Sequence, residues 1–254
     1  MIYTCYIDVT QFENETLFRE KLNLLSPCRQ RKIAQLKQEK DRHRSLGAGL
    51  ALDHALGIYG NGLRERDMEY VFGEWGKPSL RNYPEIHFSL SHSGAYAMCS
   101  IGGSPVGNDI EWIRPGRLKV AERFFTAQEL AFLYRDQDKG RQSIRTDGSV
   151  RQPQSGRDED DGELWYEAEE TTQRLFRIWT MKESFLKVTG RGMSLPLNDF
   201  SVVVEEEKQA VCVKQCFDDV TYQMKEYGDI AGYRAAVCCP AGEEIEEGMQ
   251  PVTV

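Results

Sequence analysis

Two short segments far apart in sequence constrain this chain more than any other feature: VGNDIEW at Val106–Trp112 and WTMKESFLKVTGRG at Trp179–Gly192. Side chains alternate between the faces of a strand, so Asp109 and Glu111 project to the same side of the first segment. Glu183, in the second segment, can supply a third carboxylate. Neighbouring carboxylates repel and raise each other's pKa unless a cation lies between them. Together the segments indicate a divalent-metal site.

The types of side chain in these segments narrow the choice of metal and ligand. Carboxylates are hard oxygen donors, which select Mg²⁺, or Mn²⁺, over thiophilic metals, and Mg²⁺ usually completes its octahedron with water and substrate phosphate. Lys187, one helical turn after Glu183, would place an ammonium beside that phosphate and neutralise charge on a leaving group. Taken alone, Glu183 and Lys187 are typical of a surface ion pair, so the interpretation depends on Asp109 and Glu111.

Composition excludes several classes of protein. The 254 residues suffice for one large domain or two half-sized ones, and no segment approaches the length of a membrane span. The start, MIYTCYIDVTQ, lacks the basic and apolar regions of a signal peptide, which predicts a cytoplasmic protein. The seven cysteines are odd in number and scattered, which predicts reduced, buried thiols. Cys212 and Cys216 have no partnering His or Cys pair at ligand spacing, which argues against a zinc site.

The net charge of −8 is concentrated in one tract. Asp158 to Glu170 contains eight acidic and no basic residues, which accounts for the whole excess. The rest of the chain is balanced and can carry a local basic cleft for a small phosphorylated ligand. Nucleic acid binding is disfavoured because no stripe of Lys and Arg interleaved with aromatic residues is present.

Periodicity predicts both helices and strands. Helical spacing covers Ser26–Leu56, with Ser26 as N-cap and Pro27 at the first helical position, and a second helix covers Leu175–Thr189. The glycine- and proline-rich segment Phe72–Leu80 predicts a tight turn that presents Lys77. The predicted strands are Tyr3–Val9, a meander of Ile86–Leu90, Ala95–Ile101 and Val106–Ile113, and a second sheet of Phe200–Val204, Ala210–Cys216, Thr221–Tyr227 and Ala231–Cys239. The polar segment of about 135–174 is predicted to be a mobile acidic insertion.

His92 is a further candidate because it lies between two serines at a predicted strand-to-turn junction, where these groups can donate to phosphate oxygens. A lone histidine of this kind is more often structural. A Ser-His-acid hydrolase is disfavoured because the hydroxyls adjoin the histidine and no nucleophile-elbow pattern occurs. Neither GxGxxG nor a Walker loop is present.

The motifs VGNDIE and WTMKESFLKVTGRGMSLPLNDFSV, preceded by GKPSL and FSLSHSG, resemble the 4'-phosphopantetheinyl transferase superfamily in its long, monomeric, surfactin-synthetase-activating type. The resemblance covers most of the chain. It implies Mg²⁺-dependent transfer of 4'-phosphopantetheine from coenzyme A to a serine of an acyl or peptidyl carrier protein, with release of adenosine 3',5'-bisphosphate. It also implies an α+β fold of two similar α/β halves related by a pseudo-twofold, at residues 1–104 and 105–254, with the active site between them.

The resemblance assigns roles residue by residue. Asp109, Glu111 and Glu183 match the metal ligands, Glu183 is also the candidate base, directly or through a water, and Lys187 matches the lysine on the pyrophosphate. Contacts to coenzyme A are implied for Arg29, Lys32, Arg44, Lys77, Ser91 and His92. Glu129 matches a further acid with a supporting role.

Two departures and two alternatives accompany this interpretation. Asn108 stands where the family usually has an aliphatic residue, and the acidic insertion is longer than usual.

The first alternative is a metal-dependent hydrolase of the coenzyme A pyrophosphate, in which water replaces the carrier serine. The second is a non-catalytic module that binds coenzyme A or a carrier protein, against which the intact acids and Lys187 argue.

Overall fold

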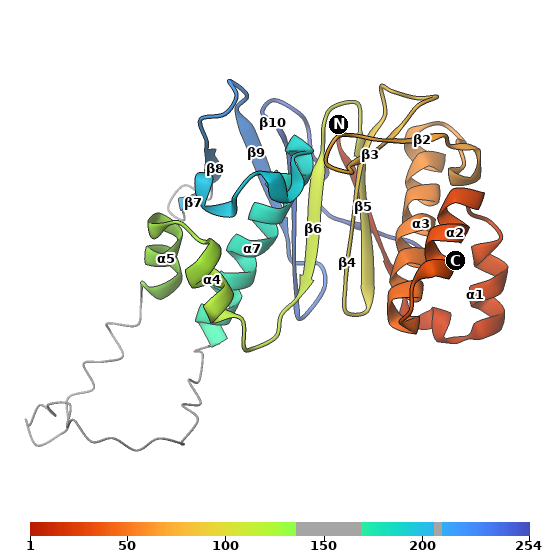
Figure 1. Cartoon of the computed structure of the whole chain (residues 1–254), viewed down its shortest axis with the longest axis horizontal. Coiled ribbons are helices and arrows are strands. Elements are labelled where there is room, and N and C mark those ends of the chain that lie inside the picture. Colours follow the sequence, from red (N-terminus) through yellow and green to blue (C-terminus); the bar gives the residue numbers. More distant parts are fainter. Residues whose placement is uncertain (136–168, 206–209) are drawn as a thin grey trace, which may run out of the picture.

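Two β-sheets stand next to each other, and one long helix packs against each of them (Figure 1). The computed structural model describes residues 1–135, 169–205 and 210–254. One sheet has the strand order β11-β1-β5-β4 and the other the order β6-β10-β9-β8-β7. The predicted α+β fold of two α/β halves is confirmed.

The strands have the following bounds. Those of the two sheets are β1 (Tyr3–Asp8), β4 (His87–Ser93), β5 (Tyr96–Gly102), β6 (Gly107–Trp112), β7 (Ser201–Glu205), β8 (Ala210–Lys214), β9 (Tyr222–Tyr227), β10 (Tyr233–Pro240) and β11 (Gln250–Pro251). A separate hairpin consists of β2 (Tyr70–Phe72) and β3 (Pro78–Leu80). The described α-helices are α1 (Glu15–Leu22), α2 (Pro27–Gln35), α3 (Glu39–Tyr59), α4 (Leu118–Phe124), α5 (Ala127–Tyr134) and α7 (Glu169–Thr189).

Helix α7 packs against the second sheet through the apolar face that the sequence predicts. Ile178, Met181, Phe185 and Val188 are all buried. The ring of Phe185 packs against that of Phe200 in a tilted arrangement, with ring centroids 4.6 Å apart. Burial of one such side chain stabilises the fold by about 1.5 to 3 kcal/mol, so this face fixes the orientation of the polar residues on the rest of the helix.

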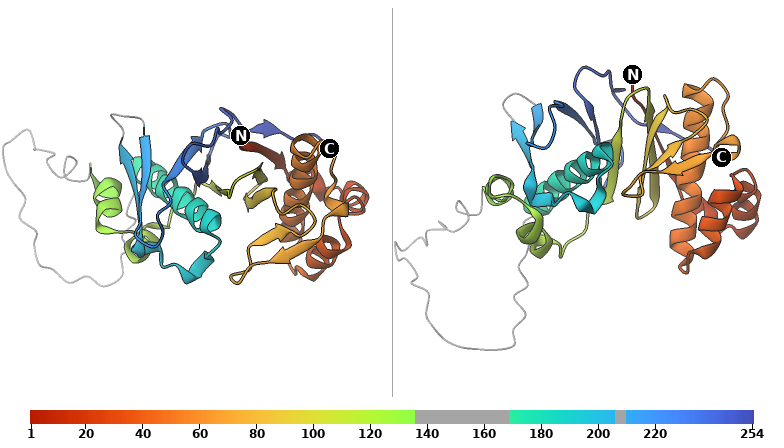
Figure 2. Two further views of the ribbon diagram at one scale, coloured as in Figure 1. Left: turned by 90° about the horizontal axis from the view of Figure 1, so that it is seen from above. Right: turned by 45° about the horizontal axis from the view of Figure 1, so that its top comes forward.

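Helix α3 covers the first sheet and is separate from α2 (Figure 2). Ser26 caps α2 as predicted, since its side chain accepts a hydrogen bond from the backbone N–H of Arg29. The continuous helical spacing over Ser26–Leu56 was misleading, because Leu36 is extended, with φ −73° and ψ 129°. The break lets α2 and α3 each bury a face of their own, and α3 continues to Tyr59.

The predicted three-strand meander is wrong in its third member. β4 and β5 pair antiparallel, but β6 pairs antiparallel with β10 in the other sheet. β4 and β6 are therefore edge strands of different sheets that contact each other through side chains, which the order of strands in the sequence does not reveal. β4 also extends to Ser93, which places His92 within the strand and not at a junction after it.

The predicted insertion of about 135–174 lies largely outside the described residues. Its predicted end is wrong, because α7 already begins at Glu169. Thr171, Thr172 and Arg174 are buried and give this first part of the helix an inward face that hydrophobic periodicity does not detect. Helices α1, α4 and α5 were also missed.

The cysteines and the helices bear on two further predictions. All seven cysteines are free. Cys28 and Cys216 are exposed, so the prediction of buried thiols is wrong at these two positions. Among the described residues, no helix combines the length and apolar character that a membrane crossing requires.

Candidate active site between the two sheets

Gly107 at the start of β6 allows this strand to approach α7 at very short range. A Cβ atom at position 107 would overlap the backbone of Ser184 and Val188 on the helix. Only glycine, which has no Cβ, permits this approach. It brings the acids of β6 next to Glu183 and Lys187.

Asp109 is the most heavily engaged of the acids. Its Oδ1 accepts hydrogen bonds from Nζ of Lys187 and from Oγ of Ser91, each at 2.8 Å. Its Oδ2 is buried and has no hydrogen-bond partner among the described residues. Two residues further on, Glu111 accepts a hydrogen bond from Oγ of Ser93 to its Oε2 at 2.8 Å. Both acids of the strand therefore project to the same side, as alternation predicts. Asp109, Glu111 and Glu183 are together called the acid cluster.

Glu183 belongs to this cluster electrostatically. Burial, with a further contribution from the charge of Asp109, raises the pKa of Glu183 to about 7, although Lys187 opposes the change. Burial and Asp109 also raise the pKa of Glu111. A carboxyl group with a pKa near neutral pH can both accept and release a proton under physiological conditions.

The residues of the cluster fit a hard divalent cation by their chemistry. Besides burial, the charge of Asp109 raises the pKa of both Glu111 and Glu183, and the unpartnered, buried Oδ2 of Asp109 is an available oxygen donor. As the side chains stand, no group of three or more His, Cys, Asp or Glu residues in the described part of the chain is close enough to hold a metal. The ammonium of Lys187 supplies the neutralising charge at Asp109.

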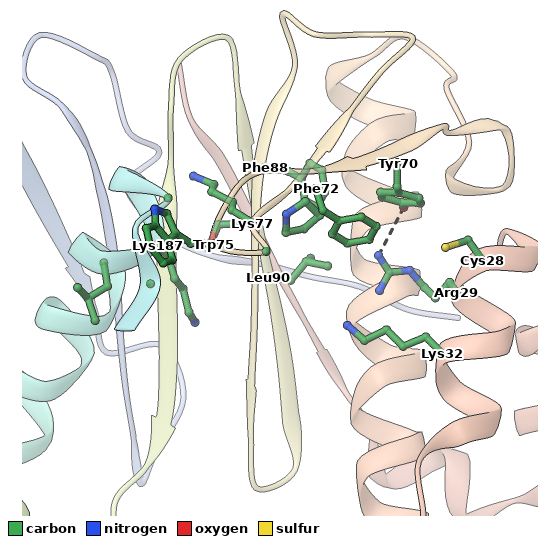
Figure 3. A pocket seen from close by; sticks show the side chains of 16 residues that line it. Cys28, Arg29, Lys32, Tyr70, Phe72, Trp75, Lys77, Phe88, Leu90 and Lys187 are labelled. Atoms are coloured by element: carbon green, nitrogen blue, oxygen red, sulfur yellow. Dashed lines mark hydrogen bonds between the residues drawn. The ribbon is translucent and has the colours of Figure 1, made fainter. Parts of the chain in front are cut away.

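A cavity of about 340 Å³ lies next to the acid cluster and is lined from both halves of the fold. Figure 3 shows Arg29, Lys32 and Tyr70 on the side of α2 and α3, and Lys187 on the side of α7. Lys187 thus lines the cavity and also contacts Asp109. The remaining lining residues are Cys28, Phe72, Trp75, Gly76, Lys77, Pro78, Phe88, Ser89, Leu90, Leu186, Gly190 and Gly192.

The cations of this cavity differ in how far their charge is already compensated. Arg29 is buried and donates from Nε to Glu65 at 2.9 Å, and its guanidinium also contacts Tyr70. Lys32 has a pKa lowered by burial and by the charge of Arg29, which indicates an ammonium without full compensation. Such a group favours an anionic ligand.

Lys77 links the two halves through backbone oxygens. Its Nζ donates to the carbonyl of Val106 at 3.1 Å and to that of Val188 at 3.3 Å. Burial lowers the pKa of Lys77 to about 8. The side chain comes from the β2–β3 turn, so the predicted presentation of Lys77 by this turn is what the structure shows.

The structure brings most of the predicted site residues together in two groups that share Lys187. Arg29, Lys32 and Lys77 line the cavity with it. Asp109 contacts the ammonium of Lys187 and the hydroxyl of Ser91, and, in addition to burial, its charge raises the pKa of Glu111 and Glu183. Arg44 and His92 are not among the residues that line the cavity. Arg44 donates to the carbonyl of Gly94 and pairs with Asp41. His92 lies on β4, and its pKa is lowered by burial and by the charges of Lys187 and Arg44.

Sequence reasoning missed Gly107 and Tyr70, and it considered Ser93 only as a neighbour of His92 that can donate to phosphate. Ser93 and Gly107 act directly on the acidic strand, and Tyr70 contacts Arg29 in the cavity wall. The alternation of serines in FSLSHSG was the available signal for Ser93. Glu129, predicted to support the site, lies in the core and pairs with Lys182 on α7 at 2.6 Å.

Fold and site together define a two-half α+β protein in which an acidic cluster and a basic cavity meet at one lysine, as suits chemistry on a phosphorylated substrate. The model of the 4'-phosphopantetheinyl transferase superfamily matches residues 105–238. The chain belongs to this family. Its members transfer 4'-phosphopantetheine, so the predicted enzyme class is confirmed.

Individual relatives agree with this assignment, two of them over nearly the whole chain. The 4'-phosphopantetheinyl transferase Sfp of Bacillus subtilis (strain 168) is 30% identical over 240 residues, covering 93% of this chain and 91% of that protein. The transferase ffp of Bacillus subtilis is 29% identical over 237 residues, with coverages of 93% and 91%. The transferase psf-1 of Bacillus pumilus is 36% identical over 159 residues, covering 59% of this chain and 55% of that protein.

Proposed function

We propose that this enzyme takes 4'-phosphopantetheine from coenzyme A and attaches it to a serine of an acyl or peptidyl carrier protein, with release of adenosine 3',5'-bisphosphate. The observation that carries the proposal is the double role of Lys187, which lines the basic cavity and contacts Asp109 in the acid cluster. A pyrophosphate that spans the cavity and the acids would meet this ammonium at the bond to be broken.

The cavity would hold the anionic nucleotide part of coenzyme A. Lys32 and Lys77 are the cations in its wall with pKa values lowered by burial, so a phosphate would relieve their poor solvation. Arg29 is already held by Glu65 and would contribute a fixed positive field. Arg44, Ser91 and His92 stay in the proposal as further coenzyme A contacts.

Glu183 is suited to accept the proton of the carrier serine. Its raised pKa, about 7, allows the carboxylate to take up a proton during the reaction, directly or through a water. The serine oxygen forms a bond to the β-phosphorus of coenzyme A as the bond to the adenosine 3',5'-bisphosphate oxygen breaks. Lys187 neutralises the charge that develops on this leaving group.

Asp109, Glu111 and Glu183 would hold Mg²⁺, or Mn²⁺ in its place. Bound there, the cation would supply charge neutralisation for the pyrophosphate.

The proposal extends to the setting of the enzyme. We propose a monomer located in the cytoplasm, and the seven free cysteines suit this compartment because disulfides persist mainly in oxidising ones. The halves are assigned to residues 1–104 and 105–254. Strand β6 opens the second sheet and supports this boundary, although β11 returns to pair with β1.

The test is the intact mass of an apo carrier protein after incubation with enzyme, coenzyme A and Mg²⁺, with and without EDTA. A gain of one phosphopantetheine group that EDTA abolishes supports the proposal. An unchanged carrier mass, together with 4'-phosphopantetheine released into solution, would instead support the hydrolase. Glu183→Gln serves as the matched inactive control in both arms.

A further inference from the structure

Three alternate serines of β4 join the two sheets where backbone pairing is missing. The hydroxyls of Ser89, Ser91 and Ser93 accept hydrogen bonds from successive alternate N–H groups of β6. The donors are Asn108 at 3.0 Å, Ile110 at 3.2 Å and Trp112 at 3.1 Å. Since β4 and β6 are edge strands of different sheets, side-chain oxygens here replace the carbonyls of a regular ladder.

Two of these serines make a second contact that the third does not make. A hydroxyl has one proton to donate, and its oxygen is the acceptor for the strand N–H. The proton of Ser91 is donated to Oδ1 of Asp109 and that of Ser93 to Oε2 of Glu111, each at 2.8 Å. The hydroxyl of Ser89 has no carboxylate partner in the described part of the chain.

We propose that Ser91 and Ser93 are positioning residues for the metal-binding carboxylates Asp109 and Glu111. Each serine anchors one carboxylate oxygen to the backbone of β6 and leaves the other oxygen for the cation. At Asp109 that other oxygen, Oδ2, is buried and unpartnered among the described residues. The inference rests on the proposed metal site and identifies the hydrogen-bond partners of two of its ligands.

The arrangement also makes the metal site depend on both halves. The carboxylates belong to β6 of the second sheet, whereas the hydroxyls that orient them belong to β4 of the first. Hydrogen-bond partners of metal ligands fix ligand orientation, and their removal typically lowers metal affinity by about 10- to 100-fold. Ser93 gives the clearer test, because Asp109 has Lys187 as a second donor to the same oxygen.

The test compares Ser93→Ala with Ser89→Ala by titrating the full chain with Mn²⁺ in the absence of coenzyme A. Each variant loses one acceptor for a β6 N–H, but only Ser93→Ala also loses a carboxylate contact. We expect Ser93→Ala to bind Mn²⁺ about 10- to 100-fold more weakly, with Ser89→Ala close to wild type. Ser93→Thr, which keeps the hydroxyl, should restore most of the affinity.

Ser91→Ala tests the Asp109 arm independently and keeps the inference falsifiable if Ser93→Ala does not fold. In Ser93→Ala, the Mg²⁺ concentration needed for half-maximal transfer should rise by about the same factor as the Mn²⁺ affinity falls. Equal Mn²⁺ affinity in Ser93→Ala, Ser89→Ala and wild type would overturn the positioning role alone. Failure of the wild-type chain to bind Mn²⁺ would overturn the proposed metal site itself, and with it this inference.

Discussion

Nζ of Lys187 on α7 lies 2.8 Å from Oδ1 of Asp109 on β6, although 78 positions separate them. The two side chains are unequally buried, with 29% of Lys187 and 7% of Asp109 exposed. Removal of the lysine would therefore leave a buried carboxylate without its counter-charge, which is costly. The contact joins the acid cluster to the basic cavity, so several expected outcomes depend on it.

Lys187→Ala should lower the rate of transfer by about 10²-fold or more, because the ammonium would no longer stabilise charge on the leaving group. The measurement is kcat for carrier modification at saturating coenzyme A. Lys225→Ala is the matched control, since Lys225 pairs with the exposed Glu247 at 2.6 Å and neither residue lines the cavity. A wild-type rate in Lys187→Ala would limit this lysine to a structural ion pair with Asp109.

Glu183→Gln should abolish transfer while coenzyme A binding persists. The amide cannot accept the serine proton, whereas the cations of the cavity are untouched. Calorimetry with coenzyme A and the mass assay on an apo carrier measure the two properties separately. Undiminished transfer would remove Glu183 from the mechanism.

The sequence predicted those features of the site that follow from local patterns. Alternation placed Asp109 and Glu111 on one face of a strand, and helical spacing placed the apolar face of α7 in the core. Whether two distant edge strands would meet could not be predicted in this way. The contacts of Ser91 and Ser93 with β6, and the break between α2 and α3, depend on tertiary packing, which outweighs local propensity.

Gly107→Ala should lower both stability and transfer. The added methyl group would overlap backbone atoms of Ser184 and Val188, which cannot move as a flexible side chain can. Overpacking of this kind typically costs about 1 to 3 kcal/mol and would displace β6, with Asp109, from α7. Urea unfolding and the transfer assay measure the two effects. Gly228→Ala, where no atom lies within 4 Å of the added Cβ, is the control for loss of a glycine without overlap.

The ammonium of Lys77 should make the free energy of unfolding depend on pH in the alkaline range. Its folded-state pKa of about 8 lies below the ordinary value of 10.5, so between these values the unfolded chain binds more protons than the folded chain. Stability contributed by this group therefore rises as pH increases from about 8 to 10.5, by on the order of 1 to 3 kcal/mol. The check is urea unfolding of wild type and Lys77→Met at several pH values. A difference between the two proteins that stays constant over this range would contradict the expectation.

Disruption of the buried ion pair of Lys182 and Glu129 should cost more unfolding free energy than disruption of the exposed pair of Arg19 and Glu15. Both side chains are fully buried, and Nζ of Lys182 also donates to the carbonyl of Phe200 at 2.9 Å. Glu129 accepts further bonds from the N–H groups of Thr126 and Val202. The pair thus ties α5, α7 and β7 together next to Glu183.

Removal of one partner leaves a buried charge uncompensated, so Lys182→Met alone should cost about 3 to 5 kcal/mol of unfolding free energy. Combining it with Glu129→Leu removes the stranded carboxylate as well, and the double variant should be more stable than the sum of the single effects predicts. Arg19→Ala is the control, because the exposed Arg19–Glu15 pair should contribute less than about 1 kcal/mol. Strictly additive losses in urea unfolding would show that the two buried charges act independently, against the 2.6 Å contact between them.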